Sequence, residues 1–156
     1  MAQLLIGYPT IEIYCQPHVA KLLDHFLKRN GNKVLFSNHW SACLLKHMLQ
    51  KHNPDWDYEP LKEKYCAKFI IEISESEMQK RGSMLSPKRT MEFNTLVDKH
   101  FEETMYYRTE MNRANGMTEE EAIYEGLKHH GLTDDDYSWE AAHMAVWRWK
   151  NKLEGK

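Results

Sequence analysis

The stretch GLTDDDYSWEAAHMAVWRWK, residues 131–150, decides the architecture expected for the C-terminal half of this chain. Gly131 is the type of residue that ends a helix in a left-handed conformation, and Leu132 supplies the hydrophobic contact that often follows. Ser138 is a favoured N-cap residue, so a second helix is expected to begin directly after it. Helical spacing predicts one packed face on that helix, made of Trp139, Ala142, His143, Val146, Trp147 and Leu153. The outline is that of a helix-turn-helix.

Two further helix starts precede this stretch. Thr118 opens the sequence TEEE, which has the spacing of a capping box, so a helix should begin there and run to His130. Ser86 and Pro87 are a typical N-cap and first helical residue. The helix that they begin should extend to about Ala114, a length of roughly 40 Å at 1.5 Å per residue. Its apolar stripe comprises Phe93, Val97, Phe101 and Met105.

The N-terminal half carries strand patterns. Residues 10–15 alternate between apolar and polar, and residues 65–73 do so over a longer run, which predicts two strands. A helix is expected from Pro17 to the Asn30-Gly31 pair. Residues 80–83 are expected to form a loop. We also expect a short strand over residues 33–36, and a helix capped by Ser37 or Asn38 that runs toward His52 with Trp40, Leu44, Leu45 and Met48 buried.

These elements predict an α+β fold. A small N-terminal sheet of two or three strands with two helices is followed by a mainly helical C-terminal half with a helix-turn-helix-like end. We expect an α+β unit over residues 1–80 and a helical unit over residues 84–156, packed as one compact domain. A chain of 156 residues normally forms one domain.

Composition narrows the class of protein. The hydrophobic content of 42% and aromatic content of 12% predict a folded, soluble protein, and no apolar run approaches the roughly 20 residues of a membrane span. No signal-peptide pattern is recognised at the N-terminus. Cys15, Cys43 and Cys66 are odd in number and widely spaced, which favours reduced thiols. We therefore expect cytoplasmic residence and no membrane partner.

Charge is the main guide to a partner. The chain has a formal net charge of −2, which gives no general nucleic-acid signature. Three aspartates, Asp134 to Asp136, precede the last helix, where they stabilise the helix start but would repel phosphates. Between residues 116 and 156, only the stretch from Arg148 onward is basic. Any contact with nucleic acid is therefore predicted at Arg148, Lys150 and Lys152, with Lys88 and Arg89 as a second patch at a helix start that can attract anions.

The sequence gives weaker evidence for a metal-binding or catalytic site. His39, Cys43 and His47 lie four residues apart on one helical face, and Cys15 and His18 form a further pair, so a zinc site is one interpretation. The paired-ligand spacings of structural zinc sites are absent, and the alternative is a core-facing cysteine flanked by partly exposed histidines. No glycine-rich phosphate loop or nucleophile motif is present. We predict no enzyme activity, no catalytic residue, no metal and no cofactor.

Five short segments carry a resemblance. MTEEEAIYEGLKHHG followed by LTDDDYS and VWRWK, together with IEIYCQPHVAKLL and LSPKRTMEFNTLV, resembles small uncharacterised proteins of phages and mobile elements of gut bacteria. These segments cover about half of the chain. The resemblance implies a mobile-element origin and an accessory DNA-binding role, and it transfers no catalytic residue.

The sequence thus favours a small non-enzymatic binding or regulatory protein, with DNA as the leading expected partner. The competing interpretation is a protein-interaction module or homodimer anchored by exposed Trp147 or Trp149, because aromatic residues dominate binding hot spots. The two differ in salt response, since phosphate contacts weaken steeply with ionic strength.

Overall fold

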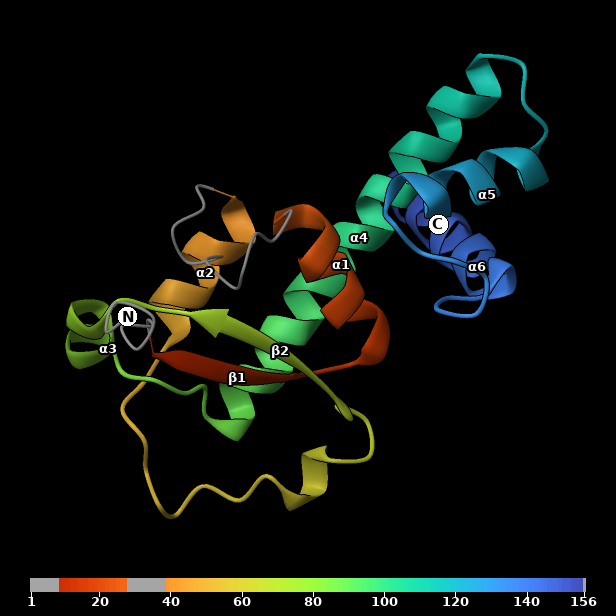
Figure 1. The fold of residues 1–156 in the computed structure, drawn as a ribbon. Coiled ribbons are helices and arrows are strands. Elements are labelled where there is room, and N and C mark those ends of the chain that lie inside the picture. The colour runs from red at the N-terminus through yellow and green to blue at the C-terminus, as the bar shows by residue number, and fades with distance from the viewer. Residues whose placement is uncertain (1–8, 28–38, 156) are drawn as a thin grey trace. The chain divides into compact units, whose positions relative to one another are not determined.

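The computed structural model describes residues 9–27 and 39–155. The chain divides into two compact units: unit 1, residues 1–94, and unit 2, residues 95–156. The boundary falls inside the longest helix, α4 (Pro87–Ala114). Over the described ranges the fold is α+β, with one two-stranded sheet in unit 1 and a helical unit 2, as the sequence predicts (Figure 1). Within those ranges, no helix combines the length and apolarity needed to cross a membrane.

The sheet of unit 1 pairs β1 (Thr10–Cys15) with β2 (Ala67–Glu72) in antiparallel register, with Ile13 opposite Phe69. Alternate residues of both strands are buried, which confirms the two predicted strands. The strand expected over residues 33–36 lies outside the described residues.

Two helices and a short 3₁₀ turn accompany the sheet. α1 (Pro17–Leu27) buries Val19, Leu22 and Leu23, and the 3₁₀ turn η3 spans Glu59–Leu61. α2 (Trp40–Met48) is shorter than expected, because its chain becomes extended at Leu49. The predicted buried face of α2 was partly wrong: its fully buried residues are Ser41, Ala42 and Leu45.

The expected loop over residues 80–83 is corrected by the structure. Lys80 and Arg81 form the last turn of a helix, α3 (Glu75–Arg81). Ser74 caps it by accepting a hydrogen bond from the Glu77 backbone N–H (3.2 Å), and Arg81 pairs with Glu77 at 2.6 Å. No residue of α3 is buried, so the helix has no apolar periodicity by which to recognise it.

A buried amide attaches α4 to the end of β1. The Asn94 side chain accepts a hydrogen bond from the Gln16 backbone N–H (3.0 Å) and donates to the carbonyl oxygens of Tyr14 (3.0 Å) and Thr90 (2.8 Å). Asn94 is 1% exposed, so without these hydrogen bonds its own amide group would be buried without a partner. The first turns of α4 are therefore fixed to the sheet of unit 1.

Unit 2 consists of the rest of α4 with α5 (Glu119–His129) and α6 (Trp139–Leu153). The predicted caps are confirmed, because Thr118 accepts from the Glu121 N–H and Ser138 from the Ala141 N–H. Gly126 lets α5 approach α4 closely, since a Cβ there would stand 3.0 Å from the methyl carbon of Met105. The core of this unit is formed by Val97, Phe101, Met105, Ala122, Ile123, Leu127, Ala142, Ala145 and Val146.

A matched pair of glycines tests the packing at the end of α3. Gly82 (φ +104°) and Gly116 (φ +96°) both adopt a conformation that favours glycine, but only at Gly82 would a Cβ collide with backbone, 2.1 Å from the Gln50 carbonyl carbon. We expect Gly116→Ala to lower the free energy of unfolding by about 1 kcal/mol and Gly82→Ala by about 3 kcal/mol or more. Urea unfolding followed by circular dichroism measures both. Equal losses would contradict the steric argument.

Candidate nucleic-acid interface

The first predicted patch, at the start of α4 in unit 1, holds one exposed cation. Lys88 is exposed, whereas the half-buried Arg89 donates a hydrogen bond from Nη1 to the carbonyl oxygen of Met48 (2.8 Å). Met48 is the last residue of α2, so this guanidinium satisfies a carbonyl at a helix end. Its contact gives Arg89 a structural role within unit 1.

The second predicted patch, on α6, divides between two sides of the helix. Arg148 and Lys152 lie one turn apart and line a hollow together with Lys99 and Glu102 of α4 and with Trp149. We call this set of five residues the basic hollow. Lys150 lies on the other side of α6, beside Trp147. Arg148 and Lys152 are therefore brought together, and Lys150 is separated from them.

The basic hollow has an excess of positive charge. It contains three cations and one carboxylate, a formal net charge of 3 − 1 = +2. Arg148 Nη2 donates to Glu102 Oε1 at 3.0 Å, where the arginine side chain is 53% exposed and the glutamate 19%. Lys152 Nζ lies 4.6 Å from the centroid of the Trp149 ring, a cation-π distance. One cation is thus paired with a carboxylate, one contacts an aromatic ring, and Lys99 joins them from a different helix.

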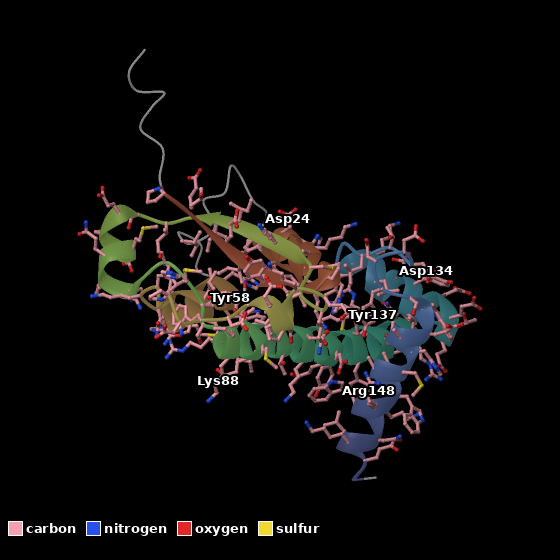
Figure 2. All side chains as sticks on the ribbon, turned by 90° about the horizontal axis from the view of Figure 1, so that it is seen from below. Asp24, Tyr58, Lys88, Asp134, Tyr137 and Arg148 are labelled. Carbon is pink, nitrogen blue, oxygen red and sulfur yellow. The ribbon has the colours of Figure 1, made fainter. Side chains whose placement is uncertain are left out.

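Tyr137 lies close to this hollow, in the turn before α6; Figure 2 labels it and Arg148. Burial raises the pKa of its hydroxyl to about 12, with further increases from the nearby carboxylates of Asp98 and Glu102 and an opposing effect of Arg148. Its ring meets Phe101 edge-on at 5.1 Å between centroids. Tyr137 is therefore a neutral, packed residue at neutral pH.

Two of the aspartates before α6 stabilise the turn and the helix start. Asp134 accepts a hydrogen bond from the Trp139 N–H (2.9 Å), and Asp136 accepts from the Thr133 N–H (2.9 Å). From residue 131 to residue 147 the sequence contains no lysine or arginine. The start of α6, the end that reads bases in helix-turn-helix proteins, is thus strongly acidic.

A second hollow lies on the other side of α6, and we call it the Trp147 hollow. It is lined by Thr109, Glu110, Arg113, Glu119, His143, Val146, Trp147 and Lys150. Its lysine and arginine balance its two glutamates. His143 Nε2 lies 2.7 Å from Glu119 Oε1, and its ring stacks on Trp139 at 4.9 Å.

Trp147 and Leu153 were wrongly expected on the packed face of α6. They are 52% and 53% exposed, whereas Ala142, Ala145 and Val146 are buried. Trp147 follows Ala142 by five residues, which turns its side chain about 140° away at 100° per residue. The buried stripe is therefore narrower than the distribution of large apolar residues indicates.

The histidine and cysteine cluster on α2 has no metal-binding arrangement. Within the described residues, no three histidine, cysteine or acidic side chains converge on one point. The His39 Nδ1 accepts a hydrogen bond from the Ser41 N–H at 3.2 Å, and the ring stacks on Phe26. Cys43 and His47 are exposed, so the expectation of a core-facing cysteine was wrong for Cys43. Cys15 is buried, and this burial raises its pKa to about 12.

Lys99 is the residue of the basic hollow that sequence analysis missed. It lies within a long helix rich in charged residues, and only the packing of α6 against α4 brings it to Arg148 and Lys152.

No family model matches the chain, and neither the curated proteins nor the solved structures that were compared with it show a significant similarity.

The raised pKa of Tyr137 predicts a loss of stability at high pH. The folded state holds the hydroxyl proton up to about pH 12, whereas an unfolded tyrosine releases it near the ordinary value of 10.0. This contribution is complete below pH 10 and is lost as the pH rises toward 12. Between pH 10 and pH 12, the free energy of unfolding should fall less in Tyr137→Phe than in wild type, as measured by urea unfolding. Tyr124→Phe, at a 45% exposed position, is the control and should follow wild type.

Proposed function

We propose that unit 2 binds nucleic acid through the basic hollow. The observation that carries the proposal is the convergence of Lys99 from α4 with Arg148 and Lys152 from α6 around the Trp149 ring. Phosphate contacts by lysine and arginine supply most sequence-independent affinity for nucleic acids. The role is one of binding, without catalysis of a reaction, and a cytoplasmic location fits it.

Binding requires an exchange of partners at Arg148. In the free protein its guanidinium pairs with Glu102, and a phosphate would have to replace this carboxylate. Because the pair is partly exposed, its own contribution to stability is small, so the exchange costs little. Arginine also presents two parallel donors to phosphate, which favours the new partner.

The orientation differs from that of a compact helix-turn-helix. The contact is made by the last two turns of α6, while the aspartate-capped start of the helix stays away from the phosphates. An accessory nucleic-acid-binding role agrees with the resemblance to phage and mobile-element proteins, and that origin stays a prediction.

A second candidate function is homodimerisation through Trp147. This side chain is 52% exposed and has the 45% exposed Met144 one turn away. Tryptophan at the centre of a contact surface is a frequent hot spot. These two exposed apolar side chains favour a surface that a partner covers.

Removal of two cations tests nucleic-acid binding. We expect Arg148→Gln combined with Lys152→Gln to weaken binding about tenfold or more at low salt and to reduce the slope of log K against log salt by roughly 1.5, because two phosphate contacts are lost. Fluorescence anisotropy with labelled oligonucleotides across a salt series measures both quantities.

Two controls accompany this variant. Lys51→Gln with Lys128→Gln removes the same charge at exposed positions outside the hollow and should leave the salt slope unchanged. Glu102→Gln should strengthen binding severalfold, because it frees Arg148 and removes the one carboxylate of the hollow. An equal loss in both double variants would assign the binding to net charge and contradict the proposed site.

The second candidate makes a separate prediction. If Trp147 anchors a homodimer, sedimentation velocity should show concentration-dependent association that changes little with salt and is lost in Trp147→Ala. Trp147→Ala should leave the salt slope of nucleic-acid binding intact. A wild-type protein that stays monomeric at every concentration would contradict the homodimer.

A further inference from the structure

We infer that the ligand of the basic hollow is single-stranded nucleic acid, with an unpaired base stacked on Trp149 and the adjoining phosphates bound by Lys99, Arg148 and Lys152. This inference rests on the proposed function and specifies the form of nucleic acid that the hollow accepts.

The first argument is the position of the ring among the cations. Trp149 is half-buried, so one part of the indole is held by the protein while another part lines the hollow. Proteins that bind single strands combine a basic groove for the backbone with aromatic rings on which bases stack. The basic hollow places both components within one small surface.

The second argument is the contact between Lys152 and the ring. The ammonium group lies 4.6 Å from the ring centroid, so in the free protein an exposed side chain contacts this ring. Lys152 is exposed, and it can leave the ring for a phosphate when a base takes its place. The lysine then exchanges a cation-π contact for a charge-assisted hydrogen bond.

The third argument disfavours a duplex. Two phosphate strands flank the groove of a duplex, and a helix that enters it brings its whole exposed face close to them. On α6 that face begins with Glu140 and is preceded by the exposed Asp134 and Asp135. A single strand can cross the basic end of α6 without approaching these carboxylates.

The experiment compares three labelled probes at low salt: an oligothymidylate, an oligouridylate of equal length, and a mixed-sequence duplex with the same number of phosphates. We expect both single strands to bind at least tenfold more tightly than the duplex. The difference between the first two probes shows whether DNA or RNA is preferred.

Variants of the ring test the stacking directly. Trp149→Phe keeps an aromatic face, whereas Trp149→Leu keeps apolar bulk without one. We expect Trp149→Leu to weaken single-strand binding about tenfold and Trp149→Phe to weaken it much less, since the loss of one stacked base has about this effect. Circular dichroism and thermal unfolding check that both variants are folded.

The outcomes separate the inference from the proposed function. Equal or tighter binding of the duplex, with dependence on Arg148 and Lys152, would overturn the single-strand inference and leave nucleic-acid binding in place. Equal affinities of Trp149→Leu and Trp149→Phe would likewise reject stacking. If none of the three probes binds at low salt, both proposals fail.

Discussion

The burial of one apolar stripe on α4 is the constraint on which both units depend. Phe93, Val97, Phe101 and Met105 follow one another at four-residue spacing, and each is fully buried. In unit 1 this stripe adjoins Asn94, whose side-chain amide forms hydrogen bonds with the backbone at the end of β1, at Tyr14 and Gln16. In unit 2 it provides the core against which α5 and α6 pack. A polar substitution in the stripe would therefore bury a polar group without a partner in one unit or the other.

The sequence predicts the elements that have both a periodic apolar pattern and a cap. α4 begins where Ser86 and Pro87 indicate and ends at Ala114 as predicted, and β1 has the predicted bounds. Such agreement is expected, because local propensity and burial specify the same structure there. The missed helix α3 is the opposite case: it is held by the Ser74 cap and an ion pair on its surface, without a buried face.

The side chains of the candidate site are harder to predict from sequence. Periodicity placed Trp147 in the core because tryptophan is large and apolar, but small residues, Ala142 and Ala145, form the contact side of α6. An alanine face allows helices to pack closely, and it moves the larger residues outward. Lys99 presents the same difficulty, since its neighbours from α6 in the hollow are about fifty positions away in the sequence. Both depend on how helices cross, which no local pattern specifies.

The charges of α6 also have an explanation that involves no ligand. Acidic residues before a helix and lysines in its last turn complement the helix dipole, so Asp134, Lys150 and Lys152 stabilise α6 wherever it lies. Arg148 is accounted for by its pair with Glu102. Lys99 differs from these residues: it lies far from both ends of α4, so the helix dipole gives no reason for it. Its position beside Arg148, Lys152 and Trp149 is therefore the feature of the hollow that most favours a ligand-binding role.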